Sequence, residues 1–168
     1  MLTTARNLLF QALIFFLIFQ LASYFRESDM LSADTKVEAT NNLSFTKVPT
    51  IMGETIPLNS QGKKTVIYFF APWCTICHIS IGNLQALYEK NPQLDVIAVA
   101  LDYVNKQDVI DFTEEHELTF PIALGNEKIK KAFSISAYPS YYVISEDNSI
   151  IWKSMGFSSE LGLYLRSL

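Results

Sequence analysis

The segment Thr65–Cys77 reads TVIYFFAPWCTIC and decides the fold. Its first six residues, Thr65–Phe70, form a continuous apolar run rich in β-branched and aromatic side chains. Such a run is typical of a central strand that is covered on both faces. A helix is expected next, over about Thr75–Lys90, so Cys74 and Cys77 lie where a buried strand gives way to a helix.

The remainder of the chain alternates strand and helix patterns. β-rich pieces around Gly53-Glu54 in residues 45–58 predict a hairpin that precedes the central strand. Further strands are expected at Leu94–Leu101, Phe120–Leu124, Ser140–Ser145 and Ser149–Lys153, and helices at Lys106–Glu117, Glu127–Phe133 and Ser158–Leu168. This order predicts one α/β sandwich with a central mixed sheet. The helix after the central strand is expected to turn Ile76, Ile79, Leu84 and Leu87 inward.

Residues 8–25 form an uncharged run, LLFQALIFFLIFQLASYF. A bilayer-spanning helix needs roughly 17–25 mainly apolar residues, so residues 1–25 are predicted to be a cytoplasmic tip and a transmembrane anchor. A cleaved signal peptide is the alternative, but its apolar stretch is usually about 7–15 residues. Arg6 and the amino terminus precede the run, and the positive-inside rule therefore predicts a cytoplasmic N-terminus with the domain outside.

Composition divides residues 26–168 into two parts. Residues 26–44 are polar and poor in aromatics, which predicts a linker, and residues 45–168 are the expected domain. The formal net charge is −4, and the densest basic cluster, Lys128, Lys130 and Lys131, is best interpreted as a solvated helix face. The sequence has no basic patch of the kind that a nucleic-acid-binding protein needs. Two cysteines are too few for a disulfide-stapled scaffold.

The placement of the cysteine pair has a chemical meaning. A helix N-terminus offers unpaired N–H groups and partial positive charge, which favour a thiolate over a thiol. Cys74 is expected to be the cap or first residue of the helix and to face solvent, with Cys77 one turn behind it. Cys74 would then attack a substrate disulfide as the nucleophile, and Cys77 would resolve the mixed disulfide. This redox-active disulfide requires no cofactor, and the reverse sequence of steps makes an oxidase.

Two motifs resemble a known family. Phe69–Trp73 followed by Cys74-x-x-Cys77 resembles the thioredoxin active-site strand and turn, and Tyr138-Pro139 resembles the loop that carries a cis-proline. The spacing between them exceeds that of a minimal thioredoxin and is similar to the TlpA/ResA/DsbE branch. The C-terminal segment Gly156–Arg166 is similar to the suppressor-of-copper-sensitivity protein D type of membrane disulfide oxidoreductase.

The resemblance implies a thioredoxin-like sandwich on the periplasmic side of a bacterial inner membrane. It implies protein thiol or disulfide substrates, contacted by Trp73, Tyr138 and Pro139, and recycling by a membrane thiol–disulfide electron-transfer partner. Because the branch mostly reduces disulfides, the reduced dithiol is the expected working form.

Two positions at which family members carry a carboxylate depart from the family. Thioredoxin carries a buried aspartate on the central strand where this chain has Tyr68, and ResA-type proteins carry a glutamate where it has Ser80. Proton transfer at Cys77 would therefore use water or another group. Tyr138 is also bulkier than the family's common threonine, which would narrow the substrate loop.

Three other interpretations stay open at this point. A static disulfide is one, although a bridge that closes so short a loop stabilises little. A copper or zinc binder would use Cys74 and Cys77 with His78 or His116 as ligands. His78 is expected to point away from Cys74, and His116 to be solvated, so no resident metal is predicted. A peroxidase would need a hydroxyl-bearing residue before the cysteine, which Ala71–Trp73 lacks.

Overall fold

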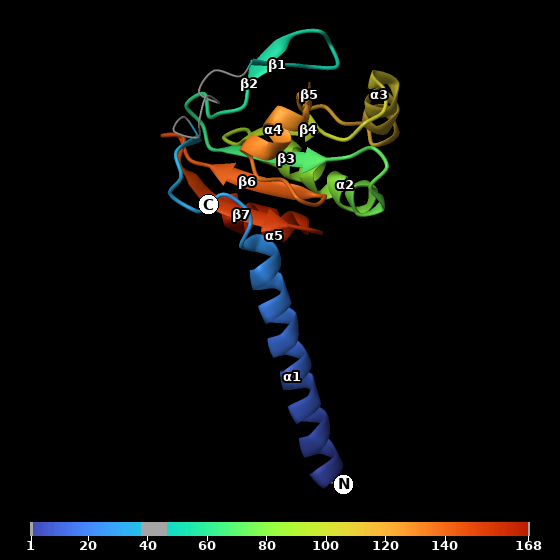
Figure 1. Cartoon of the computed structure of the whole chain (residues 1–168), viewed down its shortest axis with the longest axis vertical. Coiled ribbons are helices and arrows are strands. Elements are labelled where there is room, and N and C mark those ends of the chain that lie inside the picture. Colours follow the sequence, from blue (N-terminus) through green and yellow to red (C-terminus); the bar gives the residue numbers. More distant parts are fainter. Residues whose placement is uncertain (1, 38–46, 168) are drawn as a thin grey trace.

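The computed structural model describes residues 2–37 and 47–167. A long N-terminal helix extends away from an α/β domain in which helices pack on a central sheet (Figure 1). In chain order the elements are α1 (Leu2–Glu27), β1 (Lys47–Pro49), β2 (Thr55–Pro57), β3 (Thr65–Phe70), α2 (Thr75–Lys90), β4 (Asp95–Ala100), α3 (Lys106–Glu115), β5 (Ile122–Leu124), α4 (Glu127–Ala132), β6 (Ser140–Ile144), β7 (Ile150–Met155) and α5 (Glu160–Ser167).

The central sheet is mixed, as the sequence predicts. Its five strands lie in the order β5-β4-β3-β6-β7, with β3, β4 and β5 parallel and with β6 antiparallel to both β3 and β7. The expected hairpin is confirmed as the antiparallel pair β1–β2, with Gly53 at a φ of 91° in its turn. Glycine suits this position because a positive φ is strained for residues that carry a Cβ atom.

The central strand β3 is buried along its whole length, as a covered strand should be. Its side chains alternate between two apolar clusters, one on each face of the sheet. Val66, Tyr68 and Phe70 join the cluster formed with α2, α3 and α5, whereas Ile67 and Phe69 join the cluster that includes α4. Packing on both faces fixes the carboxyl end of β3, where the chain enters the cysteine segment.

The inward face of α2 differs from the predicted stripe. Leu84 and Leu87 are buried as expected, but Ile76 and Ile79 are 44% and 61% exposed. The buried positions are Cys77, Ser80, Ile81, Leu84, Gln85 and Leu87. Cys77 and Ser80 face the core. Ile76 and Ile79 each precede one of them by one position, so they lie on the solvent side of the helix.

Part of the expected linker packs on the domain. Met30 and Val37 are each 3% exposed and belong to the second core cluster. The backbone N–H of Leu31 donates to the Tyr142 hydroxyl at 3.1 Å. The backbones of Lys36 and Ser149 pair in an isolated antiparallel β-bridge. The boundaries 1–25, 26–44 and 45–168 stay a prediction, and residues 38–46 lie outside the described residues.

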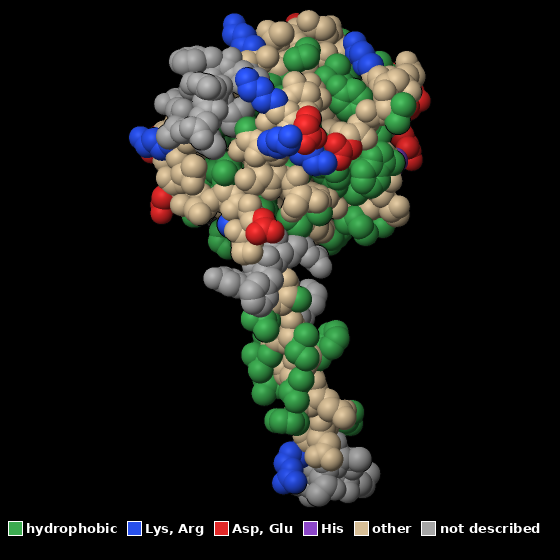
Figure 2. Space-filling view, viewed as in Figure 1, with side chains coloured by type: hydrophobic (Ala, Val, Ile, Leu, Met, Phe, Trp, Pro, Cys, Tyr) green, Lys and Arg blue, Asp and Glu red, His purple; other side chains and the backbone are tan. Residues whose placement is uncertain are grey.

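Helix α1 covers the apolar run that suggested an anchor. Apolar side chains such as Leu8, Phe10, Phe15 and Ile18 are between 61% and 72% exposed. Figure 2 shows hydrophobic side chains along this stem. Over the described residues, however, no helix combines the length and the hydropathy needed to cross a membrane. The predicted transmembrane span is therefore not confirmed.

Candidate active site

The cysteine pair lies at the junction that the sequence predicts. Cys74 is the N-cap of α2, and its backbone N–H donates to the Ala71 carbonyl at 3.0 Å. The two cysteines form a disulfide with their Cα atoms 5.2 Å apart. The backbone N–H of Cys77 points at the Cys74 Sγ atom, 3.1 Å away. A cysteine sulfur that accepts an N–H from the first helical turn is stabilised as a thiolate once the disulfide is reduced.

The two sulfur positions differ in burial. Cys74 is 6% exposed, whereas Cys77 is fully buried. Cys77 lies behind Cys74 as expected, but Cys74 is itself buried rather than facing solvent, because it packs in the same core cluster as Cys77. The chemical roles of the two residues stay predictions. The neighbours Trp73 and Ile76 are 64% and 44% exposed, so apolar surface lies next to the disulfide.

Trp73 and Tyr138, both predicted to contact substrate, are brought together. Their rings meet edge to face with centroids 5.9 Å apart. Both are held by Asp102, because the Trp73 indole N–H donates to its carbonyl at 2.9 Å and the Tyr138 hydroxyl donates to its carboxylate at 3.0 Å. Lys130 forms an ion pair with the same carboxylate. Trp73, Tyr138, Asp102 and Lys130 thus form one cluster of contacting residues beside the cysteine segment.

Burial raises the pKa of the Tyr138 hydroxyl, and the hydrogen bond to Asp102 and its negative charge raise it further. Tyr138 therefore stays protonated and donates to Asp102 at neutral pH. The Tyr138–Pro139 peptide bond is cis, and Pro139 is buried at the start of β6. The Pro139 carbonyl accepts the Gly156 N–H at 2.7 Å, so this carbonyl is already used within the protein.

Sequence reasoning did not identify Asp102 or Lys130. The carboxyl ends of the parallel strands β3 and β4 meet at one sheet edge, which is where Asp102 follows β4. That topology was a usable signal, because side chains at such edges commonly form sites. Lys130 gave no comparable signal, since its position on α4 next to Asp102 depends on tertiary packing.

The two positions that depart from the family face each other. The hydroxyls of Tyr68 and Ser80 are 2.7 Å apart and buried. Tyr68 belongs to the same core cluster as both cysteines, and burial is the main cause of its raised pKa. Among the described residues, the buried polar side chains include no carboxylate. A neutral hydroxyl pair therefore lies at the core cluster that contains both cysteines.

The C-terminal segment Gly156–Arg166 is attached to the sheet by hydrogen bonds. Ser158 donates to the buried Tyr141 hydroxyl at 2.9 Å, and Arg166 donates to that hydroxyl as well. Ser159 accepts the Gly162 N–H at 3.2 Å and so caps the N-terminus of α5. These bonds attach α5 to β6, the strand that follows Pro139.

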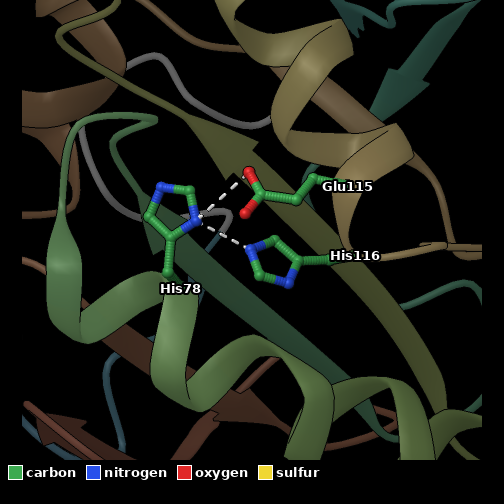
Figure 3. Close-up of side chains that lie close together, drawn as sticks. All are labelled: His78, Glu115 and His116. Carbon is green, nitrogen blue, oxygen red and sulfur yellow. Dashed lines mark hydrogen bonds and ion pairs between the residues drawn. The ribbon is translucent and has the colours of Figure 1, made fainter.

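His116 does not lie as the sequence suggested. His116 is half-buried rather than solvated, and its Nε2 atom is 2.8 Å from the Nδ1 atom of His78 (Figure 3). Burial and the neighbouring His78 lower the pKa of His116, whereas Glu115 opposes this effect. Both histidine rings contact Phe112, which explains why a residue at the end of a polar helix turns inward.

Comparison with known proteins agrees with this geometry. The chain is 32% identical over 106 residues to sporulation thiol-disulfide oxidoreductase A of Bacillus subtilis, covering 60% of this chain and 64% of that protein. It spans just under two thirds of that relative's length. It is 25% identical over 169 residues to the thiol-disulfide oxidoreductase ResA of Bacillus cereus, covering 96% of each.

The crystal structure of StoA from Bacillus subtilis superposes with a TM-score of 0.66 and 28% identity, over 73% of this chain and 95% of that one. The predicted resemblance to the TlpA/ResA/DsbE branch and the thioredoxin-like fold are thus confirmed, whereas the likeness to the suppressor-of-copper-sensitivity protein D type stays a prediction. The AhpC/TSA family model matches residues 41–153. Because this match covers most of the chain, the protein belongs to the AhpC/TSA family.

Proposed function

We propose that the chain is a protein thiol–disulfide oxidoreductase that works through Cys74 and Cys77. The observation that carries this proposal is the Cys74–Cys77 disulfide at the N-cap of α2, with the Cys77 N–H directed at the Cys74 sulfur. The relatives named above are thiol-disulfide oxidoreductases, which supports the same chemistry.

In the reducing direction, the Cys74 thiolate attacks one sulfur of a substrate disulfide and forms a mixed disulfide. The other substrate sulfur leaves as a thiolate and takes a proton from water. Cys77 then loses its proton and attacks the Cys74 sulfur, which releases the second substrate thiolate and forms the Cys74–Cys77 disulfide. The substrate gains two electrons and two protons, which the dithiol loses.

The surface around the disulfide fits a protein substrate. Trp73 and Ile76 flank Cys74 and expose apolar surface. The Trp73 ring is fixed by its bond to Asp102, so little side-chain freedom is lost on binding. Trp73, Tyr138 and the buried Pro139 thus form the proposed substrate contacts, and a membrane thiol–disulfide partner would return electrons to the disulfide.

The direction of exchange is tested by the equilibrium redox potential of the full-length protein. Trp73 is next to Cys74, so its fluorescence should report the thiol–disulfide transition in glutathione buffers. A reductase should have a potential near or below about −250 mV, whereas a value near about −120 mV is that of a strong oxidant. A chain with no reversible two-electron transition would not be an oxidoreductase of this kind.

The proposal also includes attachment to the outer face of a bacterial inner membrane through α1. It goes beyond the hydropathy criterion, which α1 does not meet, and is supported by the exposed apolar side chains of this helix. A soluble protein rarely leaves so much contiguous apolar surface uncovered. Arg6 before the apolar run favours a cytoplasmic N-terminus.

Attachment is tested by alkaline extraction of membranes from cells that make the full chain. Replacing Leu13 and Leu17 with lysine should release most of the protein, because a charge at the centre of a membrane helix costs about 2.5–3.5 kcal/mol. As a control, lysines at Met52 and Leu165, which are exposed on the domain, should leave the protein bound. Release of the unmodified chain by alkali would contradict attachment through α1.

A further inference from the structure

The chain contains two histidines, and the fold brings both to one place. His78 lies in the first turn of α2 and His116 caps the C-terminal end of α3. Their facing ring nitrogens are 2.8 Å apart, and the Glu115 carboxylate is 3.6 Å from the same His78 nitrogen. Figure 3 shows the three side chains converging from the two helices. One ligand atom from each lies within 4.8 Å of the others.

These distances suit a small divalent cation. Zinc binds imidazole nitrogen at about 2.0–2.1 Å, so neighbouring ligands in a tetrahedral site are about 3.3 Å apart. The observed separations of 2.8 and 3.6 Å lie on either side of that value. A shift of about half an ångström would bring each of these two pairs to the separation of ligands that share one ion, and the exposed Glu115 side chain can adjust toward His116.

His78 is already oriented as a metal ligand is. Its Nε2 atom lies 2.8 Å from the Pro72 carbonyl oxygen, which can only accept a hydrogen bond. Nε2 must therefore carry a proton, and in the neutral ring the lone pair of Nδ1 is directed at His116 and Glu115. Histidine ligands in metalloproteins commonly donate their other ring N–H to a carbonyl or carboxylate in this way.

The rings are also fixed by packing. Phe112 is 2% exposed, and its ring centroid lies 4.6 Å from that of His78 and 4.7 Å from that of His116. The backbone N–H of His116 is bonded to carbonyls of α3. Ligands that are held before an ion arrives lose less conformational freedom on binding it.

An entry path lies beside the cluster. A hollow of about 340 Å³ is lined by Trp73, His78 and Glu115, together with Asp108 and Asp111. The two aspartates accept hydrogen bonds from Asn105 and Gln107 and add negative charge to the wall. A cation could therefore reach His78 and Glu115 from solvent through this hollow, with water completing its coordination.

We propose that His78, Glu115 and His116 form a binding site for a borderline divalent transition-metal ion of the Zn²⁺ class. Two imidazoles and one carboxylate are donors that zinc accepts, and three protein ligands leave an open position for water. The site uses no cysteine sulfur, so it differs from a thiolate metal site at Cys74 and Cys77. It is independent of the proposed thiol–disulfide exchange.

The test is a calorimetric titration of ZnCl₂ into the full chain in detergent, with the Cys74–Cys77 disulfide intact. The disulfide removes both thiolates as ligands, so binding must come from elsewhere. We expect one Zn²⁺ per chain. His78→Ala and His116→Ala should each weaken binding by more than about tenfold, since even the outer partners of metal ligands cost 10–100-fold when removed.

Glu115→Gln, whose side chain is 63% exposed, should also weaken Zn²⁺ binding and is not expected to affect folding. The neighbouring Glu114→Gln should bind as the unmodified chain does. Zinc-edge X-ray absorption should show nitrogen and oxygen neighbours. A sulfur neighbour, no saturable binding, or full binding by the His78→Ala/His116→Ala double variant would overturn the site. None of these readouts depends on disulfide exchange.

Discussion

Replacing Cys77 with serine is expected to leave the protein trapped on its substrates as mixed disulfides. Cys74 is the more exposed of the two cysteines, and its sulfur accepts the first-turn N–H, so it can still attack a disulfide. Without the buried Cys77 thiol, the resulting bond cannot be resolved within the protein. Replacing Cys74 with serine should instead reduce disulfide exchange to the uncatalysed rate and yield no mixed disulfide.

The measurement is non-reducing electrophoresis with mass spectrometry, after incubation of the full chain with disulfide-bonded insulin. Ile79→Ser is a matched control, since Ile79 is a solvent-exposed residue on the same helix. It should leave both turnover and trapping unchanged. Trapping by Cys74→Ser but not by Cys77→Ser would reverse the assigned roles.

The sequence predicted β3 and α2 with the bounds that the structure shows, because local chemistry specifies both. Five consecutive apolar residues with β propensity, Val66–Phe70, are covered only when the strand is buried on both faces. The helix begins directly after the cysteine that caps it. Apolar spacing alone did not predict which face of α2 is buried, because Ile76 and Ile79 fit the spacing of an inward face but lie on the solvent side. Cys77 and Ser80, which are weaker signals by composition, take the inward positions.

The parts of the site that were missed depend on contacts between distant segments. Asp102 joins Trp73 to Tyr138, and Glu115 joins a pair of histidines on separate helices. Periodicity describes one helix or strand at a time and contains no information on such pairs. Met30 and Val37 were assigned to a polar linker for the same reason, because two apolar residues in a polar stretch do not predict where they pack.

Replacing Tyr68 with alanine should cause a larger loss of stability than any other substitution proposed for this domain. Its side chain is 1% exposed, lies opposite Tyr141 on the neighbouring strand and contacts Ser80. Removal of a large buried aromatic ring leaves a cavity, and the free energy of unfolding should fall by about 3–5 kcal/mol. Urea denaturation of the full chain in detergent measures this loss. A change below about 1 kcal/mol would contradict the tight packing of Tyr68.

The hydroxyl pair itself is tested by a double-mutant cycle. Tyr68→Phe and Ser80→Ala should each cost about 1–3 kcal/mol, because each leaves the other hydroxyl buried without its partner. The double variant should cost less than the sum, since both polar groups are then removed together. Thr113→Ala, at another buried hydroxyl with its own partner on α3, should add independently to Tyr68→Phe. An additive cycle for Tyr68 and Ser80 would mean that their hydrogen bond contributes nothing to stability.

The same double variant separates a structural role from a proton-transfer role. Burial raises the pKa of Tyr68, so its phenol stays protonated at neutral pH and cannot act as a base toward Cys77. If the two hydroxyls only pack in the core and satisfy each other's hydrogen bond, their removal should lower stability. The turnover of the folded protein should then stay within a few-fold of its original value. If turnover instead collapsed while the variant remained folded, the proton of Cys77 would pass through these hydroxyls. We expect a loss of stability with little change in turnover, because this chain has two neutral hydroxyls where related proteins carry a carboxylate that can gain or lose a proton.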